Sequence, residues 1–179
     1  HGQVGGTISY PIFRGDLKAD EVTMNGVTLT KVHSLVYYEN GIVTLDRTGF
    51  HQGEKGKVSA RLHYDTHSDV LRGTMDVENF DVGALLALGN QKEDRVGGAM
   101  TSHIWVGGTR DNPSLGVTGE IAAGTVAGYP VTDAALDVSL SNHVLTIDRL
   151  TGKQGDGSFS ATGTVDFNGM MDVDGTAND

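Results

Sequence analysis

Cysteine is absent from the 179 residues of this chain, which excludes a disulfide framework and any metal site built from thiolates. The absence is compatible with either redox compartment. Aromatic residues are also scarce, at 6% of the chain. Large rings help to fill the core of a β-sandwich, so their scarcity bears on which fold the chain adopts.

Positive charge is limited to 13 Lys and Arg residues against 23 Asp and Glu, for a net charge of −10. No cluster of basic residues interrupts the acidic balance. Because binding to a phosphate backbone relies mainly on cationic side chains, nucleic acid is not expected as a partner.

Long apolar runs are missing. The longest strongly apolar run is Ala84 to Leu88, whereas about 20 residues are needed to cross a bilayer. We therefore expect no membrane span inside the chain. It opens at His1 without the charged and apolar regions of a signal peptide. We interpret it as a fragment of a longer protein whose targeting segment lies elsewhere.

Repetition is the most informative feature that the sequence does contain. The pattern Val-Gly-Gly-Thr-x-x-x-Pro occurs at Val4–Pro11 and again 102 residues later at Val106–Pro113. The same offset pairs Asn40 with Asn142 and Asp46-Arg47 with Asp148-Arg149. A fixed period is typical of stacked units that share one continuous core. The sequence predicts two β-repeat units, 1–89 and 90–179, in one structure, with the polar segment 89–98 between them.

Hydrophobicity alternates with period two, which predicts antiparallel strands that have one apolar and one wet face. The apolar positions of the clearest stretches are Val58, Ala60, Leu62 and Tyr64; Leu115, Val117 and Ile121; Ala134, Leu136, Val138 and Leu140; and Phe159, Ala161, Val165 and Phe167. Turns are predicted at Asn25-Gly26, Asn40-Gly41, Asn142-His143 and Asn168-Gly169. Only 82–88, between a possible N-cap at Asp81 and a stop at Gly89, is typical of a helix.

One short helix cannot cover so many one-faced strands. The apolar faces must form a sandwich, close into a barrel, or line a trough that holds an apolar ligand. Most amphipathic strands build closed cores, which favours the first two solutions. The few aromatics and the many Ala, Val, Gly and Thr residues at facing positions favour the trough.

Several loose motifs in a fixed order resemble the repeat of the TamB branch of the AsmA-like proteins. In the second unit they are Gly107-Gly108-Thr109 to Leu115, Gly128-Tyr129-Pro130, Leu145 to Leu150, and Gln154-Gly155-Asp156-Gly157 through Gly163. The first unit carries weaker counterparts at Gly5-Gly6-Thr7 to Pro11, Thr44 to Arg47 and Val77 to Val82. The resemblance covers nearly the whole chain.

This resemblance implies an elongated, curled antiparallel sheet forming a U-shaped hydrophobic groove, in a periplasmic protein anchored in the inner membrane of a diderm bacterium. It implies movement of phospholipids between the two membranes, with phospholipid acyl chains in the groove. It also implies a TamA-type outer-membrane barrel as a partner in assembling outer-membrane proteins. The family has no catalytic residue to carry over, and no cofactor is implied.

Candidate chemistry is sparse in the residues themselves. His63 and His67 have the spacing of a helical zinc pair, but on an extended chain they stand about 13 Å apart. The aspartates in Gly155-Asp156-Gly157 and in 172–175 faintly resemble calcium-binding turns, and we interpret them as solvated turn carboxylates. Asp46 and Arg47 are adjacent and face opposite sides, so we expect cross-strand ion pairs there.

No nucleophile elbow, phosphate loop or spaced carboxylate pair stands out, so an enzyme is not expected. Trp105 is predicted to anchor the core, with the rim of a groove as the alternative. The leading hypothesis is a non-enzymatic lipid-conducting groove lined by the apolar residues of the four stretches above. The alternatives are a chaperone groove that captures unfolded outer-membrane strands by β-augmentation, and a structural or adhesive β-module with a closed core.

Overall fold

The computed structural model describes residues 1–90 and 95–178, which form twelve β-strands and one helix. The first six strands are β1 (Gly2–Gly6), β2 (Pro11–Met24), β3 (Val27–Glu39), β4 (Ile42–Gln52), β5 (Gly56–Asp65) and β6 (Val70–Asp81). After helix α1 (Val82–Leu88) come β7 (Gly97–Gly108), β8 (Pro113–Val126), β9 (Tyr129–Ser141), β10 (Val144–Gln154), β11 (Gly157–Asp166) and β12 (Met170–Asn178). The predicted all-β class is confirmed.

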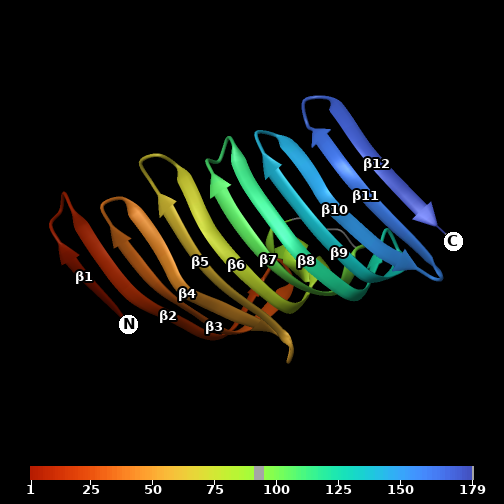
Figure 1. Cartoon of the computed structure of the whole chain (residues 1–179). Helices are drawn as coiled ribbons and strands as arrows, with labels where there is room; N and C mark the ends of the chain where they lie inside the picture. Colours follow the sequence, from red (N-terminus) through yellow and green to blue (C-terminus); the bar gives the residue numbers. More distant parts are fainter. Residues whose placement is uncertain (91–94, 179) are drawn as a thin grey trace.

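The twelve strands form one sheet in which each strand pairs antiparallel with the next strand along the chain. Figure 1 shows a single layer of bowed strands with β1 and β12 at its opposite ends. The sheet is not strongly curled, so the described residues do not form the expected U-shaped groove. A trough needs two facing walls, and in the part of the chain that the structure describes it is the start of β3 and α1 that fold over the sheet.

The sequence repeat is also a repeat of backbone structure. Strands β2, β3 and β4 recur as β8, β9 and β10 with every boundary shifted by 102 residues. Unusual backbone angles recur at the same offset: Lys31 has φ 52° and Asp133 has φ 50°. Each of these residues lies beside a register shift in its strand. The repeat therefore fixes the positions of the β-bulges as well as those of the strands.

Three of the predicted turns have the backbone that the sequence indicates. Both central residues have positive φ in Asn25-Gly26 (51° and 83°), Asn40-Gly41 (50° and 76°) and Asn142-His143 (50° and 64°). This is the requirement of a type I′ turn, which Asn and Gly meet at low steric cost. The turn at Asn168-Gly169 forms with positive φ at the glycine alone. Sequence reasoning missed the equivalent turn at Ala127-Gly128, because alanine is not a turn signal.

Helix α1 is confirmed with its predicted limits. The Asp81 carboxylate accepts a hydrogen bond from the Ala84 N–H at 2.8 Å, which satisfies one of the free donors of the first turn. Its second oxygen accepts from the Gly98 N–H at 3.3 Å, which connects the helix start to β7. Residues 91–94 of the polar segment 89–98 that follows the helix lie outside the described residues, so the role of this segment as a unit boundary stays a prediction.

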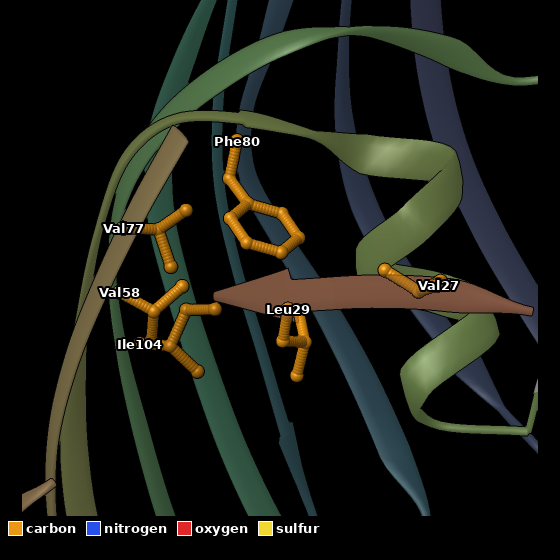
Figure 2. Close-up of a cluster of buried hydrophobic side chains, with 6 residues drawn as sticks. All are labelled: Val27, Leu29, Val58, Val77, Phe80 and Ile104. Atoms are coloured by element: carbon orange, nitrogen blue, oxygen red, sulfur yellow. The ribbon is translucent and has the colours of Figure 1, made fainter. Parts of the chain in front are cut away.

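The buried core lies at one end of the strands, where the start of β3 and α1 cover the sheet. Phe80 is 0% exposed and packs edge-to-face against Phe50, with ring centroids 5.9 Å apart. Figure 2 shows Phe80 together with Val58, Val77 and Ile104, and with Val27 and Leu29 from β3.

The start of β3 must bend over the sheet to reach this cluster. In a flat sheet β3 and β7 would lie about 19 Å apart, at about 4.8 Å per strand. Helix α1 nevertheless contacts both strands. The Asn25 side chain, at the tip of the β2–β3 turn, donates a hydrogen bond to the Ala87 carbonyl at 3.0 Å. One end of the apolar face is thus covered by the chain itself.

Three local predictions are wrong. Trp105 is 41% exposed and lies on the polar side of β7, where it packs over Gly116: a Cβ there would lie 1.8 Å from the indole nitrogen. The indole is accommodated because its cross-strand neighbour has no side chain. The aspartates of 172–175 lie within β12 and not in a turn. Phe167 lies beyond the end of β11 and is 62% exposed.

Candidate functional site: the apolar face

The pairing register places the alternating apolar residues of neighbouring strands directly beside one another. Val117 of β8 pairs with Ile104 of β7 on one side and with Val138 of β9 on the other, and Val138 pairs with Ile147 of β10. The row continues through Met75 of β6, which pairs with Ile104. We call the side of the sheet that carries these rows the apolar face.

Most of the residues predicted to line a groove lie on this face. Fourteen of the fifteen belong to strands β5, β8, β9 and β11 and pair in register with other apolar positions: Val58, Ala60, Leu62, Tyr64, Leu115, Val117, Ile121, Ala134, Leu136, Val138, Leu140, Phe159, Ala161 and Val165. Phe167 is the exception, because it follows the end of β11.

Sequence reasoning missed the apolar residues of the intervening strands. Leu45 of β4 pairs with Leu62, and Leu145 of β10 pairs with Leu140 and Val165. A register shift at Asp46-Arg47 and another at Asp148-Arg149 interrupts the alternation in β4 and β10. A period-two search stops at such a bulge, because an extra residue moves the next side chains to the other face.

Residues 1–90 and 95–178 leave large parts of the apolar face without protein cover. The chain exposes 11541 Å² of surface. A compact monomer of its 18.9 kDa mass exposes about 8,300 Å². The excess of about 3,000 Å² fits a single layer that leaves one side of most strands open to solvent.

The two ends of the apolar face differ. At the closed end, Ile121 and Met100 are buried together with Ala134 beside the start of α1. At the open end, Tyr64 is 37% exposed and Leu71 is 36% exposed. The Tyr64 hydroxyl donates a hydrogen bond to Asp69 in the following turn, which raises the pKa of Tyr64. The ring of Tyr64 therefore lies on the apolar face. Its hydroxyl lies at the edge of that face, beside the turn between β5 and β6.

The opposite side of the sheet carries polar side chains and cross-strand ion pairs. Arg61 of β5 donates to Asp46 of β4 at 2.7 Å, and this hydrogen bond lowers the pKa of Asp46. The cross-strand ion pair expected for the first Asp-Arg dipeptide is therefore confirmed. For Asp148 and Arg149 no ion pair is found among the described residues. Lys153 instead pairs with Asp133 at 2.9 Å on the neighbouring strand.

The histidines are used in local contacts. His63 Nδ1 lies 3.0 Å from the Thr44 hydroxyl on β4, whereas His67 lies in the turn after β5 and 3.6 Å from Asp65. The backbone N–H of His67 and the Ser68 hydroxyl both donate to Asp65, which lowers the pKa of that carboxyl. In residues 1–90 and 95–178, no group of three or more His, Asp or Glu side chains is placed to hold a metal ion.

Comparisons with known proteins give no further guide to this face. No family model matches the chain, and no curated protein or solved structure matches it. Among the described residues, no helix has the length and apolar character needed to span a membrane.

Proposed function

We propose that the chain is a non-enzymatic lipid-binding segment whose apolar face holds phospholipid acyl chains. The observation that supports this proposal best is the combination of in-register apolar rows with a missing cover over most of the sheet. A face of this kind suits a long flexible apolar ligand better than a compact polar one, because its rows consist mostly of apolar side chains and the Ser102 hydroxyl that lies among them is buried.

The energetics suit transfer as well as binding. Each CH₂ group removed from water contributes about 0.8 kcal/mol, so a partly covered acyl chain is held by several kcal/mol. Along the central row, from Met75 to Ile147, the paired side chains are all apolar and of comparable size, so a bound chain meets little change in energy as it slides there. Headgroups would stay in solvent beyond the open end, near Tyr64 and Leu71.

The motifs shared with the TamB branch give this segment its proposed setting. We propose a periplasmic location, within an inner-membrane-anchored protein of a diderm bacterium, and movement of phospholipids between the inner and outer membranes. A TamA-type barrel is the proposed outer-membrane partner. The U-shaped groove implied by the resemblance would then require further units beyond this chain, since this one forms a shallow, open face.

Lipid extraction from the purified chain, followed by mass spectrometry, tests the proposal directly. Val138→Asp places a carboxylate in the middle of an apolar row, where a bound acyl chain would leave it without a partner. We expect roughly tenfold less crosslinking to a lipid that carries a photoactivatable acyl chain, since a cost of about 1.4 kcal/mol is already tenfold. Leu136→Asp is expected to act in the same way.

Ser139→Asp is the matched control, because it adds the same charge one residue further along β9, on the polar side. It should retain the lipid crosslinking of the unmodified chain. Circular dichroism and unfolding midpoints should show that all three variants keep the sheet. Equal lipid crosslinking in Val138→Asp and Ser139→Asp would show that acyl chains do not lie on the apolar face.

A second candidate function is a chaperone groove for unfolded outer-membrane strands, whose alternating apolar residues the uncovered rows of the apolar face would also hold. In that case an extended strand peptide would bind the purified chain and lipid would not be recovered. A structural module with a closed core has less support, because the exposed surface exceeds that of a compact monomer.

A further inference from the structure

A pocket of about 360 Å³ lies at the open end of the apolar face, among three neighbouring turns. Figure 1 shows the β1–β2, β3–β4 and β5–β6 turns in a row along one edge of the sheet. Each turn contributes to the lining, which includes Ser9 and Tyr10, then Tyr38, Asn40 and Gly41, and finally His67.

Hydrogen bonds hold one wall of the pocket in place. The backbone N–H and the hydroxyl of Thr66 both donate to the Gly41 carbonyl at 2.8 Å, which fixes the β5–β6 turn against the β3–β4 turn. The His67 N–H donates to the Asp65 carboxylate at 2.9 Å. The His67 ring then lies over Gly41 so closely that a Cβ at position 41 would collide with it. Glycine at this position therefore makes room for the ring.

The second unit repeats the backbone of these turns and bridges the space between them. The Asn112 N–H donates to the Thr109 hydroxyl at 3.2 Å, just as the Tyr10 N–H donates to the Thr7 hydroxyl at 3.2 Å. The Asn112 side chain also donates to the Asn142 side chain at 3.0 Å, which joins the β7–β8 turn to the β9–β10 turn. In the first unit, Tyr10 takes the place of Asn112 and the pocket lies between the equivalent turns.

The rings around the pocket are particular to the first unit. At the equivalent positions the second unit carries Asn112, Leu140 and Asn168 in place of Tyr10, Tyr38 and His67. Because the same turns form in the second unit without these rings, the backbone does not require them. Three rings gathered around one opening indicate a contact with a ligand.

The lining favours a cation over an anion. Among the described residues that line the pocket, none is a lysine or an arginine, so a phosphate or carboxylate would meet no permanently charged partner. The faces of tyrosine rings attract ammonium groups, and the oxygens of Ser9 and Asn40 accept N–H donors. The Asp65 carboxylate lies 3.6 Å from the His67 ring, and the net charge of −10 also attracts cations.

We propose that this pocket binds the ammonium group of a phospholipid headgroup, an assignment that rests on the proposed function of the apolar face. Tyr38 connects the two sites, because it pairs with Phe13 of β2 and with Val43 of β4 on that face. Val43 in turn pairs with Tyr64 at the open end. A lipid whose acyl chains lie along the rows therefore leaves its headgroup within reach of the pocket.

Vesicles that contain phosphatidylethanolamine and phosphatidylglycerol in equal amounts, with the same acyl chains, test the headgroup preference. The chain is incubated with them and repurified, and its bound lipids are measured by mass spectrometry. The double variant Tyr10→Asn, Tyr38→Leu introduces the residues of the second unit and leaves the net charge unchanged. We expect the ratio of ethanolamine to glycerol lipid to be about fivefold higher for the unmodified chain than for this variant, with equal total lipid.

Tyr129→Leu is the matched control, because it removes a tyrosine that is 63% exposed at the closed end. It should keep the ratio of the unmodified chain. Tetramethylammonium chloride should lower this ratio and leave the total lipid unchanged, compared with sodium chloride at the same ionic strength.

Equal ratios for the unmodified chain and the double variant would overturn the headgroup site and leave acyl-chain binding standing. Absence of bound lipid from every chain would overturn the proposed function together with it. Binding of tetramethylammonium to the lipid-free chain, with no effect on the lipid ratio, would assign the pocket to a free organic cation and would also overturn the proposal.

Discussion

At the scale of single residues, Phe80 connects the sheet to the elements that fold over it. It is 0% exposed and contacts Phe50. We expect Phe80→Ala to lower the free energy of unfolding by about 3–5 kcal/mol, through lost burial and the cavity left behind. Phe167→Ala removes an equally large ring that is 62% exposed and should change stability by less than about 1 kcal/mol. Urea unfolding of the two variants measures both effects, and similar losses would contradict this account of the core.

The pairing of Asp46 with Arg61 predicts a dependence of stability on pH. The folded-state pKa of Asp46 is lowered, so its contribution is complete above its unfolded pKa of about 3.9 and is lost as pH falls through the folded value. Asp46→Asn should therefore be less stable than the unmodified chain at pH 7, and the difference should disappear once the pH falls below the folded-state pKa of Asp46. Arg61→Gln should remove the same pH-dependent part. Unfolding midpoints across this range provide the measurement, and a difference that is constant with pH would refute the assignment.

At the scale of elements, α1 depends on its cap at Asp81. Asp81→Ala removes the acceptor for the Ala84 N–H and should cost about 1–2 kcal/mol. Asp81→Asn keeps a capping oxygen and should lose less. Amide hydrogen exchange at Ala84 and thermal unfolding would distinguish the two variants, since only the alanine variant should lose protection at the helix start. Identical behaviour would mean that the cap does not limit the stability of this end of the sheet.

Elements with a strong local signal could be predicted from the sequence, and those set by cross-strand contacts could not. The limits of α1 follow from Asp81 and Gly89, and the type I′ turns follow from Asn-Gly. The bulge at Asp46-Arg47 has no local signature, because positive φ at Arg47 is imposed by the register of β4 on β5. Trp105 was misplaced for a similar reason: the space that it occupies is provided by Gly116 on the next strand.

At the scale of the whole molecule, the single-layer sheet should unfold with an unusually weak response to denaturant. An unfolded chain of this mass exposes about 27,000 Å², so a compact fold would bury about 19,000 Å² and this one buries about 16,000 Å². Because the urea m-value scales with the surface exposed on unfolding, we expect it to be about a sixth lower than for a compact protein of equal length. An m-value typical of compact proteins in a monomeric sample would indicate that the apolar face is covered in solution.

The covering of the face is the part of the site that sequence reasoning left open. Period-two alternation placed residues such as Val117 and Leu136 on one side of the sheet, and the register agrees. It could not decide between sandwich, barrel and trough, because alternation is the same in all three. The decision depends on contacts between residues far apart in sequence, such as that of Asn25 with the end of α1.

Because each strand pairs with the next one along the chain, the width of the sheet across its strands grows in proportion to the length of the chain. From β2 to its counterpart β8 the sheet advances by six strands over 102 residues, or about 29 Å at about 4.8 Å per strand. A compact domain would need about eight times its volume to double its diameter, whereas this architecture doubles its reach by doubling its sequence. One unit advances by nearly the roughly 30 Å thickness of a bilayer's hydrocarbon core. Gene duplication alone would therefore be enough to adjust how long such a sheet becomes.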